Sequence, residues 1–202
     1  MRKAFLSELG DVAAKRILEI GCGQGRDAIA FARVGLDVVA LDHSSVALDH
    51  ARAAYDRERE SMQDRDADRI EWRPHDYGER GVLIDTEPFD AVYSHLSLHY
   101  FSDKATRRLF EDIKRALRPG GLLFFTVRSR DDVLFHEGDP LEGEDYRCHL
   151  GHVRRFFSEA YAHELLSDWS GVKGETYVVR DEKINPGTFI WCMARRSDSD
   201  NR

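Results

Sequence analysis

Short runs of aliphatic and aromatic residues recur along the chain and stop at glycine, proline or charged residues. Runs of this length that are rich in valine, isoleucine, leucine and phenylalanine are typical of β-strands. Several are apolar at consecutive positions, which is typical of strands that are buried on both faces, as in parallel sheets. The expected strands are 16–20, 37–41, 70–74, 89–94, 122–127, 174–179 and 188–195.

Between these runs, apolar side chains recur every three or four residues, the spacing that places them on one face of a helix. Ser44 and Ser158 each precede such a stretch and can cap the helix that follows. The expected helices are 27–34, a segment after Ser44, 104–117, and a segment after Ser158 in which Tyr161, Leu165 and Trp169 share one face.

This order of strands and helices predicts an α/β protein with one doubly wound, mostly parallel seven-stranded sheet. The last two strands have no helix between them, so we expect an antiparallel strand near one edge. We expect a single domain over 1–196, with 1–15 as a helix or cover. Residues 129–155 lack a clear period, and because loops of that length are often binding elements, we assign them to the substrate side. Residues 57–69 are expected to be a helix end and a loop, and 197–202 a disordered tail.

Composition and charge limit the partners that the chain can have. It has 202 residues, 42% hydrophobic and 33% charged, and a formal net charge of −7. Its basic residues are interleaved with acidic ones, so binding to nucleic acid or to an anionic membrane is disfavoured. No apolar run approaches the roughly 18 residues of a membrane helix, and no signal sequence is recognisable. The odd number of widely spaced cysteines (Cys22, Cys148 and Cys192) is typical of reduced thiols, so we expect a soluble, cytoplasmic protein.

Three alternating glycines, Gly21, Gly23 and Gly25, follow the first strand and precede a helix. Glycines let the backbone turn sharply and let a ligand approach the main chain, and the start of a helix suits a carboxylate or phosphate. The third glycine comes too early for a dinucleotide fingerprint, because Arg26 follows it, and the Gly-Lys-Ser/Thr of a P-loop is absent. Loops of this kind also connect strands to helices without binding anything.

Asp42 ends the second expected strand, where a carboxylate can accept hydrogen bonds from both hydroxyls of a ribose. The alternative is an aspartate that caps the next helix beside Ser44. Its place at the end of an otherwise apolar strand favours the ribose. The glycine loop and Asp42 together predict a nucleoside with an amino-acid-like or other anionic tail.

Five motifs occur in a fixed order around the expected strands. They are Leu-Glu-Ile-Gly-Cys-Gly-Gln-Gly at 18–25, Leu-Asp at 41–42, His-Asp-Tyr at 75–77, Phe-Asp-Ala-Val-Tyr-Ser at 89–94 and Leu-Arg-Pro-Gly-Gly at 117–121. In these motifs the chain resembles the class I S-adenosylmethionine-dependent methyltransferases, which have a Rossmann-like fold. The resemblance covers roughly residues 16–195, and the ordered set of motifs is far more specific than a glycine loop alone.

The resemblance implies a role for each matching residue. Glu19 would hold the methionine amine, directly or through water, and Ser94 and His95 would lie near the methionine part. The remaining cofactor residues would be the backbone of Gly21, Cys22, Gly23 and Gly25, Asp42 on the ribose, His43 on the adenine, Asp76 on the adenine amino group and Tyr77 beside it. Asp76 has an alternative as a turn residue before Gly78.

Three further stretches resemble a narrower group, the small-molecule methyltransferases of the tellurite-resistance and thiopurine types. They are Gly-Arg-Asp at 25–27, Ser-His-Leu-Ser-Leu-His-Tyr-Phe at 94–101 and Gly-His-Val-Arg-Arg-Phe-Phe-Ser at 151–158. The chain departs from that group because only about 15 residues precede the first strand. A short N-terminal cover leaves the substrate side less enclosed or requires closure by a partner subunit.

Acceptor-side candidates are weaker. His99 follows the fourth strand and is a candidate general base, although it could instead be a packing residue. Tyr146 is a candidate substrate contact, and His152 with Arg154 or Arg155 could bind an anionic or polar group. The alternative for these arginines is ion pairing with Glu159 and Asp168. We expect no metal, because Leu96 stands between His95 and His99 where a zinc hydrolase carries glutamate, and Cys148, His149 and His152 lack a second pair with zinc-finger spacing.

The expected reaction is methyl transfer from S-adenosylmethionine to oxygen, nitrogen, sulfur or a metalloid of a small molecule. It proceeds by in-line displacement and leaves S-adenosylhomocysteine. A nicotinamide oxidoreductase is the alternative on a similar fold. RNA methylation is a further one, although residues 94–97 lack the base-binding Pro-Pro motif of such enzymes. A non-catalytic cofactor sensor would keep the same loop. The protein is expected to be a monomer or a homodimer.

Overall fold

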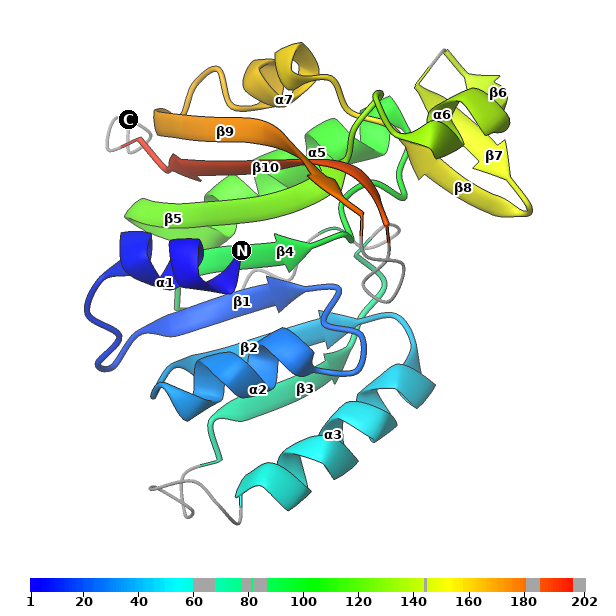
Figure 1. Ribbon diagram of the computed structural model, residues 1–202. Coiled ribbons are helices and arrows are strands. Elements are labelled where there is room, and N and C mark those ends of the chain that lie inside the picture. Colours follow the sequence, from blue (N-terminus) through cyan, green and yellow to red (C-terminus); the bar gives the residue numbers. More distant parts are fainter. Residues whose placement is uncertain (60–67, 78–80, 82–86, 144, 181–185, 198–202) are drawn as a thin grey trace.

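A sheet of seven strands runs through the part of the chain that the structure describes (Figure 1). The computed structural model describes residues 1–59, 68–77, 81, 87–143, 145–180 and 186–197. The order of the strands is β3-β2-β1-β4-β5-β10-β9. Their bounds are β1 (Arg16–Ile20), β2 (Asp37–Asp42), β3 (Ile70–Pro74), β4 (Phe89–His95), β5 (Leu117–Arg128), β9 (Ser170–Val179) and β10 (Gly187–Arg195).

The sheet is parallel except at one edge. β1 lies between β2 and β4, and every pairing from β3 to β5 is parallel. β10 is antiparallel both to β5 and to the edge strand β9. The predicted doubly wound sheet with an antiparallel strand near its edge is therefore confirmed.

Helices cover both faces of this sheet. Figure 1 shows α1, α2 and α3 in front of the sheet and α5 behind it. The bounds of the helices are α1 (Arg2–Leu9), α2 (Arg26–Arg33), α3 (Ser45–Arg59), α5 (Asp103–Ala116), α6 (Val133–Glu137) and α7 (Glu159–Leu165). The predicted caps are present, because the Ser44 hydroxyl accepts from the Ala47 amide at 3.2 Å and the Ser158 hydroxyl from the Tyr161 amide at 3.1 Å.

One predicted helix is shorter than its pattern suggested. The segment after Ser158 was expected to continue through Trp169, but α7 ends at Leu165. Beyond it the amides of Leu166 and Trp169 bond to carbonyls only three residues back, at 3.2 and 3.0 Å. Trp169 is nevertheless buried in the core, because these tight turns carry its side chain to the same side as the helix would.

Two apolar clusters flank the sheet. Phe5 of α1, Phe31 of α2 and Tyr55 of α3 belong to one, and Leu109 and Ile113 of α5 to the other. Strand residues alternate between them, as the pleat requires: Ile17 and Tyr93 face α1 and α2, and Leu18 and Val92 face α5. Since residues two apart share a face, Glu19, His95 and Phe189 all lie on the face of α1 and α2, beyond Ile17, Tyr93 and Trp191.

Residues 129–155 contain regular structure that the sequence did not predict. After α6, the strands β6 (Asp139–Glu142), β7 (Tyr146–His149) and β8 (His152–Arg155) form a small antiparallel sheet in that order. Figure 1 shows it beyond the carboxyl end of β5. The expected irregular loop was wrong because these four-residue strands have no apolar alternation. They are joined by backbone pairing, and the Arg147 guanidinium of β7 lies 4.2 Å from the centroid of the Phe135 ring of α6.

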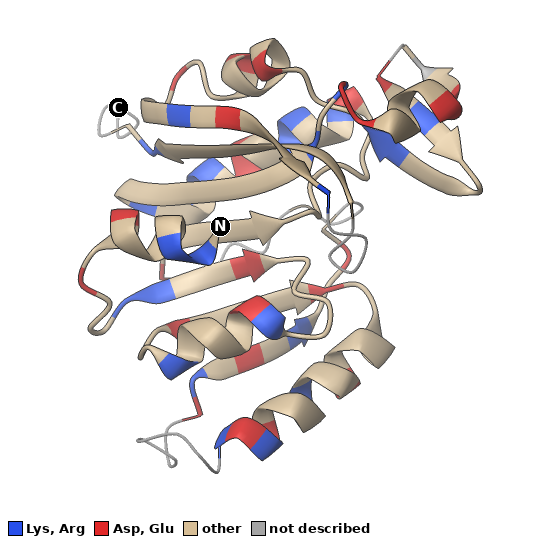
Figure 2. Ribbon diagram, viewed as in Figure 1, with Lys and Arg blue, Asp and Glu red and all other residues tan. Residues whose placement is uncertain are grey.

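The distribution of charge agrees with the interleaving in the sequence. Figure 2 shows acidic and basic residues on the same element in α2, α3 and β9. No helix in the described chain is both long and apolar enough to cross a bilayer. The helix end predicted over 57–69 is confirmed as far as Arg59, while 60–67 and the predicted tail after Ser197 lie outside the described residues.

Candidate functional site

The glycine loop packs tightly between β1 and α2. The amides of Gly21 and Cys22 both donate to the carbonyl of Leu41, at 2.8 and 2.9 Å, so the loop is joined to β2. A Cβ on Gly21 would lie 2.0 Å from the Ser97 hydroxyl oxygen, and its φ of 75° is a conformation that favours glycine. Gly25, also with positive φ, would place a Cβ 2.6 Å from the ring of Trp72. The loop geometry therefore requires glycine at both positions.

The carboxylate of Asp42 holds this loop from the other side. One of its oxygens accepts from the Gly23 amide at 2.8 Å and the other accepts from the Ser44 amide at 2.9 Å. The second bond closes a local turn. The helix cap that the sequence left open as an alternative for Asp42 is instead the Ser44 hydroxyl, which accepts from the Ala47 amide. Each carboxylate oxygen has a further lone pair, so the two bonds leave room for two ribose hydroxyls.

A cavity of about 320 Å³ lies beside Asp42 at the carboxyl ends of β1 and β2. It brings together Asp42, His43, Asp76 and Tyr77, as the sequence predicted. The complete lining is Gly21, Asp42, His43, Asp76, Tyr77, Leu96, Ser97, Tyr100 and Phe101. Tyr77 is hydrogen-bonded to Ser97, and burial raises the pKa of its phenol, which stays protonated.

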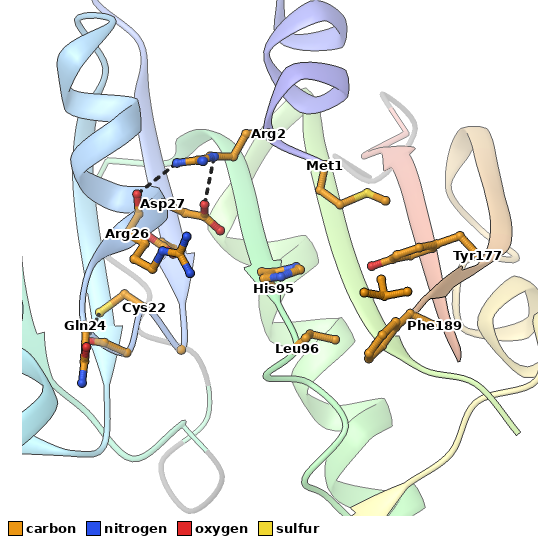
Figure 3. A pocket seen from close by; sticks show the side chains of 14 residues that line it. Met1, Arg2, Cys22, Gln24, Arg26, Asp27, His95, Leu96, Tyr177 and Phe189 are labelled. Carbon is orange, nitrogen blue, oxygen red and sulfur yellow. Dashed lines mark hydrogen bonds and ion pairs between the residues drawn. The ribbon is translucent and has the colours of Figure 1, made fainter. Parts of the chain in front are cut away.

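A larger cavity, of about 580 Å³, lies on the face of α1 and α2 (Figure 3). It meets the smaller one at Gly21 and Leu96, which line both. Its lining is Met1, Arg2, Glu19, Gly21, Cys22, Gly23, Gln24, Arg26, Asp27, His95, Leu96, Tyr177, Val179 and Phe189. Arg26 and Asp27 follow the glycine loop directly in the sequence but were not predicted as site residues. Tyr177, Val179 and Phe189 were also missed, and only their positions in the folded chain connect them with the glycine loop.

Glu19 presents a buried carboxylate to the larger cavity. Its side chain is 3% exposed, and its Oε2 has no hydrogen-bond partner among the described residues. Burial, and next the negative charges of Asp27 and Asp42, raise the pKa of Glu19 well above its ordinary value of 4.5. A buried carboxylate with one unpartnered oxygen is a ready acceptor for an ammonium group.

Replacing Glu19 with glutamine should stabilise the empty protein and weaken cofactor binding. Because the pKa of Glu19 is raised by folding, ionisation costs stability once the pH exceeds 4.5. We expect the variant to melt about 3 °C or more above wild type at pH 8, the shift that roughly 1 kcal/mol produces in a chain of this size. The difference should vanish near pH 4. Affinity for S-adenosylmethionine should fall about 10-fold or more, because a charged hydrogen bond is lost. Thermal melts across pH measure the change in stability, and calorimetry measures the change in affinity. A variant that melts below wild type at pH 8 would contradict this reading of Glu19.

An ion pair connects the N-terminal helix to the start of α2. Arg2 Nε lies 3.2 Å from Asp27 Oδ1, and a guanidinium nitrogen of Arg2 donates to the Arg26 carbonyl at 3.2 Å (Figure 3). The Tyr93 hydroxyl donates to the other oxygen of Asp27 at 3.0 Å. The helix expected within 1–15 is thus present as α1, and its first residues form part of the wall of the larger cavity.

His95 and Leu96 stand where β4 ends between the two cavities. His95 Nδ1 is hydrogen-bonded to Thr126 Oγ1 at 2.6 Å, and burial lowers the pKa of the imidazole below its ordinary 6.5. Leu96 has a φ of 56°, uncommon for a residue with a side chain. Its amide donates to the carbonyl and to the hydroxyl of Thr126, at 3.0 and 3.1 Å, which stabilises this turn.

The structure places two predicted residues of this region outside both cavities. Ser94 is fully buried and its hydroxyl donates to the Ile20 carbonyl at 3.1 Å, connecting β4 with β1. His99 is 1% exposed, and its Nδ1 has no partner in the described chain. Burial, and next the guanidinium groups of Arg128 and Arg154, lower the pKa of His99 to about 3, so it is neutral.

The candidate substrate residues Tyr146, His152 and Arg154 lie on the small sheet, and none lines either cavity. The Arg154 guanidinium lies 5.8 Å from the ring centroid of Tyr100, which does line the smaller cavity. The two acidic residues expected to pair with these arginines have other partners, because Asp168 pairs with Lys114 and Glu159 accepts from Thr176. The Arg155 guanidinium donates to the Phe101 carbonyl at 3.3 Å. Among the described residues, no three His, Cys, Asp or Glu side chains are grouped as metal ligands.

The arrangement of the sheet is shared with solved methyltransferases. A SAM-dependent methyltransferase from Methanosarcina mazei superimposes with a TM-score of 0.79 at 18% identity, over 96% of this chain and 97% of that one. TehB from Haemophilus influenzae does so with a TM-score of 0.69 at 18% identity, over 98% of this chain and 63% of that one. The chain thus has the Rossmann-like fold of S-adenosylmethionine-dependent methyltransferases.

Residues 17–121, just over half of the chain, match the family model described as a methyltransferase domain, and the chain belongs to that family. Two curated proteins are similar in sequence. The first is a hemagglutinin 1 of Eikenella corrodens, 23% identical over 83% of this chain and 48% of its own length. The second is a malonyl-[acyl-carrier protein] O-methyltransferase of Xylella fastidiosa, 31% identical over 64% of this chain and 40% of its own length. The chain thus spans less than half the length of these relatives.

Proposed function

We propose that this protein transfers a methyl group from S-adenosylmethionine to a small-molecule acceptor. The observation that carries the proposal is the pair of buried carboxylates, Glu19 and Asp42, on either side of a loop that excludes any Cβ at Gly21. The cavities beside them meet at that loop. One cavity suits a nucleoside and the other an amino-acid tail, so the residues present fit the cofactor.

Each end of the cofactor has partners of matching chemistry. Asp42 would accept from the ribose hydroxyls, and His43, Asp76 and Tyr77 would surround the adenine. Glu19 would hold the methionine ammonium. Arg26 begins α2, where the guanidinium and the positive end of the helix dipole would both attract the methionine carboxylate. When bound, the cofactor supplies a methyl group activated by the positive charge of its sulfonium.

The protein's own contribution to the reaction is position and exclusion of water. Holding the acceptor in line with the methyl group can supply about 7–11 kcal/mol of the barrier. The roles of His99 as a base and of Tyr146, His152 and Arg154 as substrate contacts stay predictions, as do the cytoplasmic location, the absence of a metal and the monomer or homodimer.

Calorimetric titration of the purified protein tests the cofactor assignment. S-adenosylmethionine and S-adenosylhomocysteine should each bind saturably at one site per chain, while NADH should not bind. The reason is that Arg26 stands where a dinucleotide-binding motif has its third glycine. Incubation with methyl-labelled cofactor and a panel of hydroxyl, amine, thiol and metalloid acceptors then tests transfer. Saturable binding of NADH without binding of S-adenosylmethionine would overturn the proposal in favour of an oxidoreductase.

A further inference from the structure

The larger cavity extends past the glycine loop to an aromatic wall on the β9–β10 pair. Tyr177 and Phe189 are directly opposite each other in the antiparallel register, and their ring centroids lie 5.6 Å apart at 34°. Val179 and Leu96 also line this side. Figure 3 shows Tyr177 and Phe189 across the cavity from Cys22 and Arg26, with His95 between the two groups. The far side of the cavity is therefore built of two rings: Tyr177, which is half-buried and carries a hydroxyl, and Phe189, which is 1% exposed.

The charged groups of the lining lie on the opposite side. Glu19 and Arg26 belong to the glycine-loop side, and Asp27 is paired with Arg2. No charged side chain of the described lining comes from β9 or β10. Outside the lining, the Arg128 guanidinium lies 5.0 Å from the Phe189 ring centroid and satisfies that ring's attraction for a cation. Among the described residues, an anionic acceptor would find no cation on this wall. A cationic one would be repelled by the sulfonium, whereas Arg128 is already paired with Asp132.

His95 is the polar group that faces this compartment from β4. Its Nδ1 is bonded to Thr126, and no partner for its Nε2 is found among the described residues. The charges that act on the ring are Asp27, which favours the imidazolium, and Arg2, Arg26 and the amino group of Met1, which oppose it. The ring is neutral at physiological pH, and a neutral imidazole nitrogen can accept a proton.

We propose that the methyl acceptor is an uncharged aromatic or heteroaromatic molecule with a nucleophilic O–H or N–H, held against Tyr177 and Phe189 with that group hydrogen-bonded to His95. This inference rests on the proposed methyl transfer. The acceptor heteroatom gains the methyl group as the sulfur–methyl bond breaks, with the bonding pair staying on sulfur. The proton of the O–H or N–H passes to His95 Nε2 and then to water. The released proton carries the positive charge that the sulfonium loses.

The choice of His95 over His99 follows from access. Both imidazoles are neutral, but only His95 lines a cavity, whereas His99 is 1% exposed beneath the surface. A base must reach the proton it removes at hydrogen-bond distance or through one water. The base role predicted for His99 therefore falls to His95 in this proposal.

Binding of defined probes tests the aromatic wall without requiring turnover. Saturation-transfer NMR in the presence of S-adenosylhomocysteine should detect phenol, catechol and aniline but not ethanolamine or propionate. Phe189→Ala should weaken the binding of the aromatic probes at least 10-fold, while Phe189→Leu, which keeps bulk without the ring, separates stacking from cavity loss. Binding of ethanolamine or propionate in preference to the aromatic probes, or unchanged binding of the aromatic probes by Phe189→Ala, would overturn the inference.

Calorimetry with S-adenosylmethionine on the same samples separates the two proposals. If S-adenosylmethionine does not bind to the wild-type protein, the proposed methyl transfer is wrong. If S-adenosylmethionine binds but the aromatic probes do not, only the inference of an aromatic acceptor is wrong.

Substitution of His95 tests its role as base, with turnover measured on the aromatic probe that binds most tightly. His95→Ala should lower kcat about 100-fold or more, with cofactor affinity and acceptor KM changed less than about threefold. The wild-type rate should decline as pH falls through the lowered pKa of His95, and the variant should lose that acidic limb. Added imidazole should restore part of its rate. His99→Ala should keep the acidic limb. Loss of cofactor affinity in His95→Ala, or loss of the acidic limb in His99→Ala instead, would refute the assignment.

Discussion

Replacing Gly21 with alanine should abolish cofactor binding and lower the free energy of unfolding by about 2–5 kcal/mol. The added Cβ would lie 2.0 Å from the Ser97 hydroxyl oxygen, 2.4 Å from the Ser97 Cβ and 2.9 Å from the Tyr77 hydroxyl. Overpacking of this kind costs about 1–3 kcal/mol, and a positive φ at alanine costs a further 1–2 kcal/mol or so. Since Ser97 and Tyr77 line the smaller cavity, the displacement closes the site as well as straining the loop.

Gly23 offers a matched control on the same loop. Its φ is 53°, but a Cβ there would meet no heavy atom within 4 Å. Gly23→Ala should therefore cost only the backbone part, about 1–2 kcal/mol. Chemical denaturation and calorimetry of both variants compare steric closure with backbone strain. Equal losses of stability in the two variants would show that the contact with Ser97 has no energetic weight.

Replacing Asp42 with alanine should weaken binding of S-adenosylmethionine about 100-fold or more. The variant loses two acceptors for the ribose, and hydrogen bonds to a charged group are each worth about 1.5–3 kcal/mol. It also loses the bonds from the Gly23 and Ser44 amides, so the loop itself loosens. Calorimetry with S-adenosylhomocysteine measures the sum of both effects.

A ligand that lacks a ribose hydroxyl separates the two roles of Asp42. Wild type should bind 2′-deoxyadenosine about 10-fold more weakly than adenosine. In Asp42→Ala that ratio should shrink to nearly one, because the partner of the missing hydroxyl is gone. A ratio that stays at the wild-type value in the variant would show that Asp42 only supports the loop and that another group binds the ribose.

The grouping of the proposed cofactor residues could be predicted because its signals are local in the sequence. Glu19 and the glycines lie at the end of one strand and Asp42 at the end of the next, and the carboxyl ends of parallel strands meet at one edge. The proposed acceptor side could not be predicted in this way. Tyr177 and Phe189 become neighbours only through the register of β9 with β10, which the alternation of the two strands leaves undetermined.

Two other differences between the sequence-based expectations and the structure also have specific causes. His95 and His99 are four residues apart, but the left-handed turn at Leu96 redirects the chain between them, so that His95 lines a cavity and His99 is buried. The sheet of β6, β7 and β8 was missed because polar residues form it. Its strands are paired through their backbones, and backbone hydrogen bonds do not require any particular order of apolar and polar side chains.

As the proposed partner of the methionine ammonium, the buried carboxylate of Glu19 would connect the supply of cofactor to the lifetime of the protein. A group that disfavours the empty fold and favours the occupied one widens the gap in unfolding free energy between the two states. Proteases that act on transiently unfolded chains would therefore degrade the empty form faster than the occupied one. A cell that runs short of S-adenosylmethionine would then hold fewer molecules of the enzyme as well as less of its substrate.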